Sequence, residues 1–435
     1  MVRRRWRCVA ENPGAPADDC TTAAASSVHD SPLSNPGILS RTASHHPDRP
    51  NLPACPALPY RVLLTSDFFE PGFRAGGPVR SVAKLLDDVS TAIEVTMVTR
   101  DRDLGCQQPY PGLSGRWFRR RQARIYYLDT SNRRQFYTLL RTLRSTTFDL
   151  LYVNSLWATF AIVPILAARI GVLRVRQILI APRGEVAPSA LKVKSFKKSL
   201  FLRVWRPFLR SSKVRWHATS DREAQLITRV FPWAQIETRR CDVALPPEPI
   251  TPVEINGPLR LVFIGRISPI KNVSVAIEAL TRMTRPVIFD LYGPLEDPAY
   301  WAGCQDLARE LPTLVTLTYR GELRPHEVPS TFAAYDAFVF PTQGENFGHV
   351  IAESLSASCP VVCSDQTPWT SLLRAGGGVV LAENTPAALA YHLDQLAGLT
   401  PAERLAARRA AGDTYRSWRG EARGPNILDR IRMIG

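Results

Sequence analysis

Two glutamates eight residues apart, Glu345 and Glu353, flank the tripeptide Asn346-Phe347-Gly348 behind a strand-like apolar run. In a helix, a rise of about 1.5 Å per residue would separate their backbones by roughly 12 Å and turn them by about 80°. The two acids of a glycosidase must flank one bond, with carboxyl groups about 5–5.5 or 6.5–9.5 Å apart. An ionised carboxylate only accepts hydrogen bonds, so vicinal hydroxyls of ribose or a hexose are suitable partners. The spacing therefore indicates that these acids hold different parts of one extended ligand, although acids eight apart on a helix are often merely solvated.

Two cations are expected beside the first helix of the second half. Arg266 follows the apolar run 259–264, and Lys271 comes just before a helix predicted to begin near Val273. The free amide groups and the dipole of a helix N-terminus favour anions. Arginine offers a planar fork for two phosphate oxygens, and lysine offers a compact point charge. The segment therefore predicts a diphosphate site, with a pair of ordinary surface cations as the alternative.

Further candidates lie in the first half of the chain. Gly76 and Gly77 end a loop before a predicted helix at 79–89. Glycines let backbone N–H groups approach an anion closely, and a simple turn is the alternative. Arg183 and His217 lie at the ends of predicted strands. His217 could be a base, a substrate contact or a structurally satisfied histidine.

Positioning these residues requires a regular series of strands and helices. Short apolar runs closed by polar residues predict buried parallel strands, with helical segments between them. Strands that alternate with helices predict a doubly wound α/β sheet. The alternation restarts after the proline-rich stretch 244–252, which should be a stiff linker. Ligands of such sheets bind outside the carboxyl ends of the strands, so the motifs should meet in a cleft. The predicted strands are 60–66, 93–99, 125–128, 150–153, 177–181 and 215–219 in the first domain, and 259–264, 287–292, 315–319, 337–340, 360–364 and 378–381 in the second.

The chain is predicted to divide into five parts. Its first residues are rich in Ala, Pro, Ser and Asp and lack a hydrophobic period, as disordered segments do. The C-terminal part should be a helix that packs back on the first domain. The parts are an extension at 1–58, a first α/β domain at 59–240, a linker at 241–258, a second α/β domain at 259–415, and the C-terminal helix at 416–435.

Composition narrows the class of protein. The net charge of +16 suits anionic substrates, anionic lipid or nucleic acid, and does not choose among them. Eight scattered cysteines without a Cys-x-x-Cys predict neither a disulfide framework nor a zinc site, which fits a reducing cytoplasm. Asp101-Arg102-Asp103 has a form that can hold a metal–diphosphate, but its place in the first domain argues against it.

Contact with a membrane is treated separately. No apolar run reaches the 18 or so residues of a membrane span, and Met1–Arg7 lacks the apolar core of a secretory signal. The segment 192–213 mixes cations with aromatic and aliphatic residues. It could lie on an anionic membrane surface, or it could be a domain helix with a solvated basic face. Both interpretations stay open.

With these residues assembled, the chain resembles the retaining GT-B glycosyltransferases of family 4, of the bacterial exopolysaccharide and O-antigen type. The segments 265–272, 292–301 and 340–369 carry the resemblance. It implies two Rossmann-like domains facing each other across a cleft, with a nucleotide-diphosphate sugar bound mainly by the second. It further implies transfer of a hexose, with retention, to a saccharide or polyprenyl-linked acceptor in surface polysaccharide synthesis. No metal or other cofactor is implied, and the expected location is cytoplasmic, at the periphery of the inner membrane.

The resemblance also assigns roles to individual residues. Arg266 and Lys271 would bind the donor diphosphate and act with Glu345, which would contact the transferred sugar. Glu353 would hold the ribose hydroxyls. Gly265, Asn346, Phe347 and Gly348 would complete the donor site, Gly76 and Gly77 would close over the phosphates, and Arg183, His217 and Asn154 are the acceptor-side candidates.

The chain departs from the family pattern at three places, and two other functions remain. Asn154 stands where many relatives have a histidine, Ser358 where a glycine is usual, and Cys241-Asp242-Val243 where an Asn-Gly phrase is usual. A catalytically degenerate nucleotide-sugar-binding partner of a polysaccharide assembly complex is one alternative. A GT-B sugar-nucleotide epimerase is the other. Binding to nucleic acid would explain the charge but none of the motifs.

Overall fold

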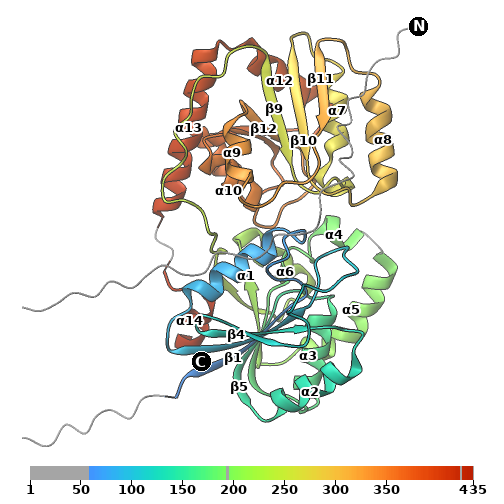
Figure 1. Cartoon of the computed structure of the whole chain (residues 1–435), viewed down its shortest axis with the longest axis vertical. Helices are drawn as coiled ribbons and strands as arrows, with labels where there is room; N and C mark the ends of the chain where they lie inside the picture. Colours follow the sequence, from blue (N-terminus) through green and yellow to red (C-terminus); the bar gives the residue numbers. More distant parts are fainter. Residues whose placement is uncertain (1–57, 193–194, 422–423, 435) are drawn as a thin grey trace, which may run out of the picture. The chain divides into compact units, whose positions relative to one another are not determined.

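The computed structural model describes residues 58–192, 195–421 and 424–434, and Pro59–Gly435 belong to one compact unit. The disordered extension predicted at 1–58 therefore lies outside the described residues, apart from Leu58. Two parallel sheets with helices form this unit (Figure 1), which confirms the predicted α/β class.

The first sheet has the strand order β3-β4-β2-β1-β5-β6-β7-β8. All neighbouring strands are parallel except β3 and β4, which form an antiparallel hairpin at one edge. Side chains alternate between two apolar clusters, with Leu63 in one and Val62 and Leu64 in the other. The strands are β1 (Tyr60–Ser66), β2 (Ile93–Arg100), β3 (Trp117–Arg120), β4 (Ala123–Leu128), β5 (Thr147–Val153), β6 (Arg174–Ile180), β7 (Val214–Ala218) and β8 (Gln235–Thr238), and the helices are α1 (Gly77–Asp88), α2 (Arg133–Arg144), α3 (Thr159–Arg169), α4 (Pro188–Lys192), α5 (Ser195–Leu209) and α6 (Asp221–Val230).

The second sheet is entirely parallel, with the order β11-β10-β9-β12-β13-β14. The strand order reverses between β9 and β12, and such a reversal opens a crevice at the carboxyl ends of the strands. The strands are β9 (Leu259–Ile264), β10 (Val287–Tyr292), β11 (Val315–Tyr319), β12 (Ala337–Phe340), β13 (Val361–Ser364) and β14 (Gly378–Leu381), and the helices are α7 (Val273–Leu280), α8 (Pro298–Ala308), α9 (Val328–Ala333), α10 (His349–Ser356), α11 (Thr370–Leu372), α12 (Pro386–Gly398) and α13 (Pro401–Gly420).

The end of the chain returns to the first sheet. A capping box between Thr400 and Glu403 starts α13, which continues to Gly420, so the boundary expected between 415 and 416 falls inside this helix. The last helix, α14 (Ile427–Ile434), places Ile427, Leu428 and Ile431 in an apolar cluster of the first sheet. Figure 1 shows α14 beside the first sheet, apart from the second.

The helix that follows β12 begins later than the Glu345–Glu353 spacing suggested. Gly348 is the N-cap of α10 and has a φ of 79°, a left-handed conformation that glycine adopts without strain. The backbone N–H of Glu345 donates to the carbonyl of Gln366 instead of entering a helix. The helical separation of about 12 Å was therefore the wrong geometry for this pair.

Candidate functional site

A cleft of about 340 Å³ lies at the carboxyl ends of both sheets, within the size range of ligand pockets. Strand and loop ends from both domains line it. The predicted residues that line it are Gly76, Gly77, Arg183, Gly265, Arg266, Lys271, Glu345, Asn346, Phe347, Gly348 and Glu353. The other two candidates, Asn154 and His217, are buried and lie outside this lining in the described chain.

Lys271 and Glu345 form an ion pair inside the cleft. The Nζ atom of Lys271 lies 2.5 Å from Oε2 of Glu345 and 5.1 Å from the centroid of the Phe340 ring. The two side chains are only 14% and 17% exposed. Lys271 ends a single 3₁₀ turn after β9, directly before α7. The turn thus holds a partly desolvated ammonium group where an anionic ligand could compete with Glu345 for it.

Arg266 is held less firmly. It follows β9, and its guanidinium lies 2.7 Å from Oε1 of Glu296, with both side chains well exposed. An exposed ion pair of this kind adds little stability, because water and salt screen it. Arg266 can therefore exchange Glu296 for a ligand oxygen at small cost.

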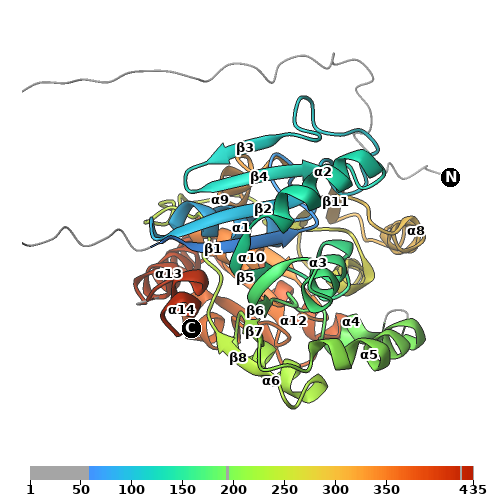
Figure 2. The ribbon, with the colours of Figure 1, turned by 90° about the horizontal axis from the view of Figure 1, so that it is seen from below.

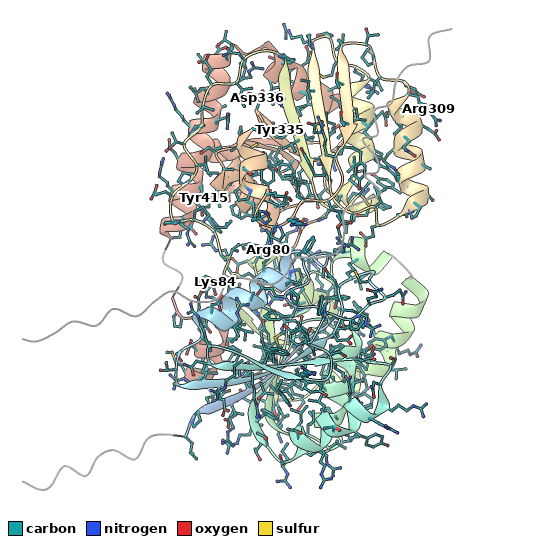
Figure 3. The ribbon with its side chains drawn as sticks, in the orientation of Figure 1. Arg80, Lys84, Arg309, Tyr335, Asp336 and Tyr415 are labelled. Carbon is teal, nitrogen blue, oxygen red and sulfur yellow. The ribbon has the colours of Figure 1, made fainter. Side chains whose placement is uncertain are left out.

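Glu353 on α10 forms an ion pair with Arg80 on α1. Arg80 is labelled in Figure 3. The Glu353 side chain is only 8% exposed, and burial lowers the pKa of Arg80. Sequence reasoning missed Arg80, although a cation one turn into the helix behind Gly76 and Gly77 was a usable signal. The carboxylate expected to bind ribose hydroxyls is thus occupied by a residue of the other domain.

Gly77 allows α1 to approach α10 closely. A Cβ atom at this position would lie 2.3 Å from Cδ2 of His349. Nε2 of His349 lies 2.8 Å from Oγ of Ser81, whose hydroxyl donates to the Gly77 carbonyl. Nε2 therefore carries the proton and donates to Ser81. Burial, followed by the charges of Arg80 and Arg183, lowers the pKa of His349 to about 3, which keeps the ring neutral.

The Arg183 side chain has partners in three residues of the first domain and the adjoining segment. Its guanidinium donates to Oδ1 of Asn154 at 2.7 and 3.1 Å and to the hydroxyl of Tyr152 at 2.9 Å. A further N–H group lies 2.7 Å from Sγ of Cys241. Asn154 and Cys241, two of the departures from the family pattern, thus both fix Arg183, which lines the cleft together with the first-domain arginines Arg74 and Arg80.

His217 lies behind this network. Its Nε2 is 2.7 Å from the carbonyl oxygen of Arg239, which can only accept, so Nε2 donates and Nδ1 accepts from the Tyr152 hydroxyl at 2.8 Å. Burial, with the charge of Arg183 second, lowers the pKa of His217 to about 3. Both nitrogens are satisfied and the ring is 2% exposed. The geometry favours the structural role over that of a base.

Asn346 connects the loop between β12 and α10 to the first domain. Its amide lies 3.1 Å from Oγ1 of Thr219, and in the orientation that satisfies both ends it donates to the Glu223 carboxylate. Glu223 is 2% exposed and also accepts from the backbone N–H groups of Gly184 and Thr219, each at 2.7 Å. Glu223 could not be recognised from the sequence, because a glutamate at the start of a helix is usually a solvated residue.

The two carboxylates of the Asp101-Arg102-Asp103 segment accept hydrogen bonds from within the first domain. Asp103 accepts from the N–H groups of Phe73 and Arg74, and Asp101 accepts from the Ser114 hydroxyl. In the described part of the chain, no three His, Cys, Asp or Glu side chains are grouped as metal ligands would be.

The basic segment 192–213 is described only in part, because the side chains of 192–200 lie outside the described residues. In its C-terminal half, Trp205 and Leu209 pack into an apolar cluster of the first sheet. No helix of the described ranges combines the length and hydropathy needed to cross a bilayer.

Comparison with known proteins matches the second domain. Residues 251–411 match the family model described as Glycosyl transferases group 1. The chain is 30% identical over 163 residues to O-antigen chain mannosyltransferase B of Escherichia coli, which covers 36% of this chain and 42% of that protein. The chain thus spans less than half the length of this curated relative.

Solved structures match both domains. Sucrose-phosphate synthase of Thermosynechococcus elongatus superposes with a TM-score of 0.66 and 17% identity, covering 86% of this chain and 98% of that one. Anabaena HepE in complex with UDP and glucose superposes with a TM-score of 0.61 and 15% identity, over 86% and 98%. Together with the two parallel sheets, these likenesses show that the chain has the GT-B fold, as predicted.

Proposed function

We propose that this chain is a glycosyltransferase that moves a hexose-type sugar from a nucleotide-diphosphate donor to a saccharide acceptor, with retention of configuration and without a metal. A lipid-linked acceptor used in surface polysaccharide synthesis at the inner face of the cytoplasmic membrane fits the proposal best. The observation that carries it is the Lys271–Glu345 pair in the cleft, which lies within the matched residues 251–411.

The charges of the cleft suit the departure of a diphosphate. Cleavage of the bond between sugar and phosphate develops negative charge on the leaving group, and fixed cations in a partly water-excluded site stabilise it. Lys271 and Arg266 are two such cations, each now paired with a carboxylate that a phosphate can replace. Release of Glu345 from Lys271 frees its oxygens to accept from a sugar hydroxyl. In this proposal the acceptor attacks on the face that the diphosphate leaves.

The donor class draws support from the neighbours of the fold. HepE was solved with UDP and glucose, and a trehalose-6-phosphate synthase was solved with UDP-2-fluoro glucose. We extend to this chain the use of a nucleotide-sugar donor, without assigning the base. The degenerate-partner alternative keeps the same cleft and differs only in lacking transfer.

The experiment is a thermal-shift screen of the purified protein against nucleoside diphosphates and nucleotide sugars, with EDTA present. We expect one donor to raise the melting temperature selectively, and Arg266→Ala to abolish most of that rise. Arg309→Ala is the matched control, because Arg309 pairs with Asp306 on the exposed face of α8 and lies outside the cleft lining. A shift that requires added metal would contradict the metal-free proposal. No shift with any donor, or an equal shift in both variants, would contradict the donor site.

A further inference from the structure

Half of the net charge of the chain is concentrated in 29 residues of the first domain. The segment 116–144 contains nine arginines and one aspartate, a net charge of +8 out of the +16 of the whole chain. It comprises β3, β4 and α2. Neither the cleft nor the proposed transfer reaction uses these arginines.

The outward side of α2 is almost entirely cationic. At about 100° per residue, Arg133, Arg134, Tyr137, Arg141 and Arg144 fall on the side opposite to the buried Leu139 and Leu143. Tyr137 is 72% exposed in the middle of these four cations. This side of the helix thus presents an amphipathic ring among guanidinium groups.

The β3–β4 hairpin adds the exposed ring of Trp117 beside this helix. Trp117 stands opposite Tyr126, with ring centroids 5.0 Å apart, and the Arg124 guanidinium lies 5.1 Å from the Trp117 ring. Tyr126 belongs to the same apolar cluster as Leu139 and Leu143, so Trp117 and α2 share one face of the sheet. Figure 2 shows β3 as the outer strand, next to β4.

Most of the nine arginines of this segment lack an acidic partner among the described residues. Across residues 58–192, 195–421 and 424–434, no ion pair involves the six outward arginines Arg116, Arg119, Arg133, Arg134, Arg141 and Arg144. Arg120, by contrast, is paired with Asp87 and Glu70. A surface of one sign repels a second copy of itself, so its partner must be anionic.

We infer that this β3–α2 surface, made of the six outward arginines with Trp117 and Tyr137, docks on an anionic lipid bilayer. Arginines near such a surface each contribute to binding, and tryptophan and tyrosine rings settle at the level of the lipid headgroups. The inference rests on the proposed function in one respect only, namely that docking would bring the enzyme to a lipid-linked acceptor. It differs from the expected contact through 192–213, where Trp205 and Leu209 are packed inward.

A groove of about 480 Å³ joins this hairpin to the cleft. Phe118, Arg119 and Tyr127 line it, together with Phe73 and Arg80, and the last two also line the cleft. Phe118 lies on the opposite face of β3 from Trp117, with its ring edge-on to Tyr127. An amphiphile anchored in the bilayer would find aromatic surface next to the donor site.

The experiment is co-sedimentation of the full chain with phosphatidylcholine vesicles, with and without about 30% phosphatidylglycerol, at low and high salt. We expect binding to the anionic vesicles only, and an affinity at least about 10-fold lower for the triple variant Arg133→Gln, Arg134→Gln, Arg141→Gln. The matched control carries Arg282→Gln, Arg309→Gln and Arg409→Gln, which lose the same charge at exposed positions elsewhere. Tyr137→Ser should weaken binding without changing the net charge.

The other outcomes overturn the inference. Equal loss in both triple variants would mean that net charge alone drives adsorption. Loss only on replacing Lys194, Lys197 and Lys198 with Gln would assign the contact to 192–213. Binding of the β3–α2 surface to RNA or heparin but not to vesicles would assign it to a polyanion. The vesicles contain neither donor nor acceptor, so failure here leaves the donor screen untouched, and failure of the donor screen leaves this result untouched.

Discussion

Lys271 and Arg266 at the carboxyl end of the second sheet are held in a different way from Arg183 at the carboxyl end of the first. In the second sheet, the Lys271 ammonium has Glu345 as its ion-pair partner, and Arg266 has the exposed Glu296. In the first sheet, three residues fix the Arg183 guanidinium, and the buried ring of His217 supports one of them. A ligand can replace the carboxylates that pair with Lys271 and Arg266 in the second sheet. In the first sheet, the network around Arg183 holds the guanidinium in one position and resists such exchange.

Free energies explain the difference. The exposed Arg266–Glu296 pair contributes about 0–1 kcal/mol. At the less exposed Lys271–Glu345 pair, the cost of desolvation offsets much of the attraction, so a phosphate can replace either carboxylate. Each buried acceptor that loses its donor costs about 1–3 kcal/mol. If Arg183 moved away, Oδ1 of Asn154 would lose the two hydrogen bonds that it accepts from the Arg183 guanidinium. We therefore expect ligand binding to rearrange the second-domain side of the cleft and to leave the Arg183 network intact.

The strongest test of this comparison is Glu345→Gln. Glutamine keeps the size of the side chain but loses the charge that pairs with Lys271 and the full accepting capacity toward a sugar hydroxyl. We expect transfer to fall by roughly 10²–10³-fold, as on loss of one strong transition-state contact, with unfolding free energy changed by less than about 1 kcal/mol. Initial rates and urea denaturation measure the two effects.

The control for this variant is Glu278→Gln, an exposed residue on α7 that should change neither quantity. Near-normal turnover in Glu345→Gln would remove this residue from the site. A large loss of stability would instead mean that the Lys271–Glu345 pair is as firmly held as the Arg183 network. The contrast between the two sheets would then fail.

A weaker effect is expected at His217, and it concerns stability against pH. Because burial lowers the pKa of His217 from 6.5 to about 3, the unfolded chain binds a proton there that the folded chain refuses. The effect of His217 on the free energy of unfolding is therefore absent above pH 6.5. Below that pH it lowers the free energy of unfolding by about 1.4 kcal/mol per pH unit as the pH drops toward 3. Glutamine can still donate to Arg239 and accept from Tyr152, but it does not titrate in this range.

The measurement is urea denaturation of the wild type and of His217→Gln at pH 7.5, 6 and 5. We expect the variant to be less stable at pH 7.5. Below pH 6.5 its free energy of unfolding should fall less steeply, because its unfolding takes up one proton fewer. The neutral His349 contributes equally to both proteins, so the difference isolates His217. Identical slopes would mean that His217 takes up a proton in the folded state and is open to the cleft, as an acceptor-side role would require.

The sequence predicted the parallel strands well because each is a short apolar run buried on both faces, such as 259–264 or 337–340. It missed β3, whose residues Trp117-Phe118-Arg119-Arg120 are mostly exposed and pair along one edge only. It missed β8 for a similar reason, since none of its residues is fully buried. Edge strands carry little hydrophobic signal, so periodicity does not reveal them.

The second-domain residues that line the cleft could be predicted, while the contacts that connect the two sheets could not. Arg266, Lys271 and Glu345 come from two segments close to strands of one sheet, where the order of strands brings them together. Arg80 meets Glu353, and Glu223 meets Asn346, only through the packing of elements more than a hundred residues apart. Local spacing contains no information about such pairs.

The smallest expected effect concerns Ser358, which stands where the family usually has glycine. It adopts a φ of 53°, a conformation that costs about 1 kcal/mol for a residue with a Cβ atom, and its hydroxyl donates to the Ile250 carbonyl at 2.6 Å. That hydrogen bond contributes a similar amount, about 1 kcal/mol, so the two effects offset each other. Ser358→Gly removes both and should leave the unfolding free energy within about 0.5 kcal/mol of the wild type. Ser358→Ala keeps the strain and loses the bond, and should cost about 1 kcal/mol. Equal stability of the two variants in urea denaturation would mean that a φ of 53° costs nothing for a residue with a Cβ atom, because both variants lack the hydroxyl.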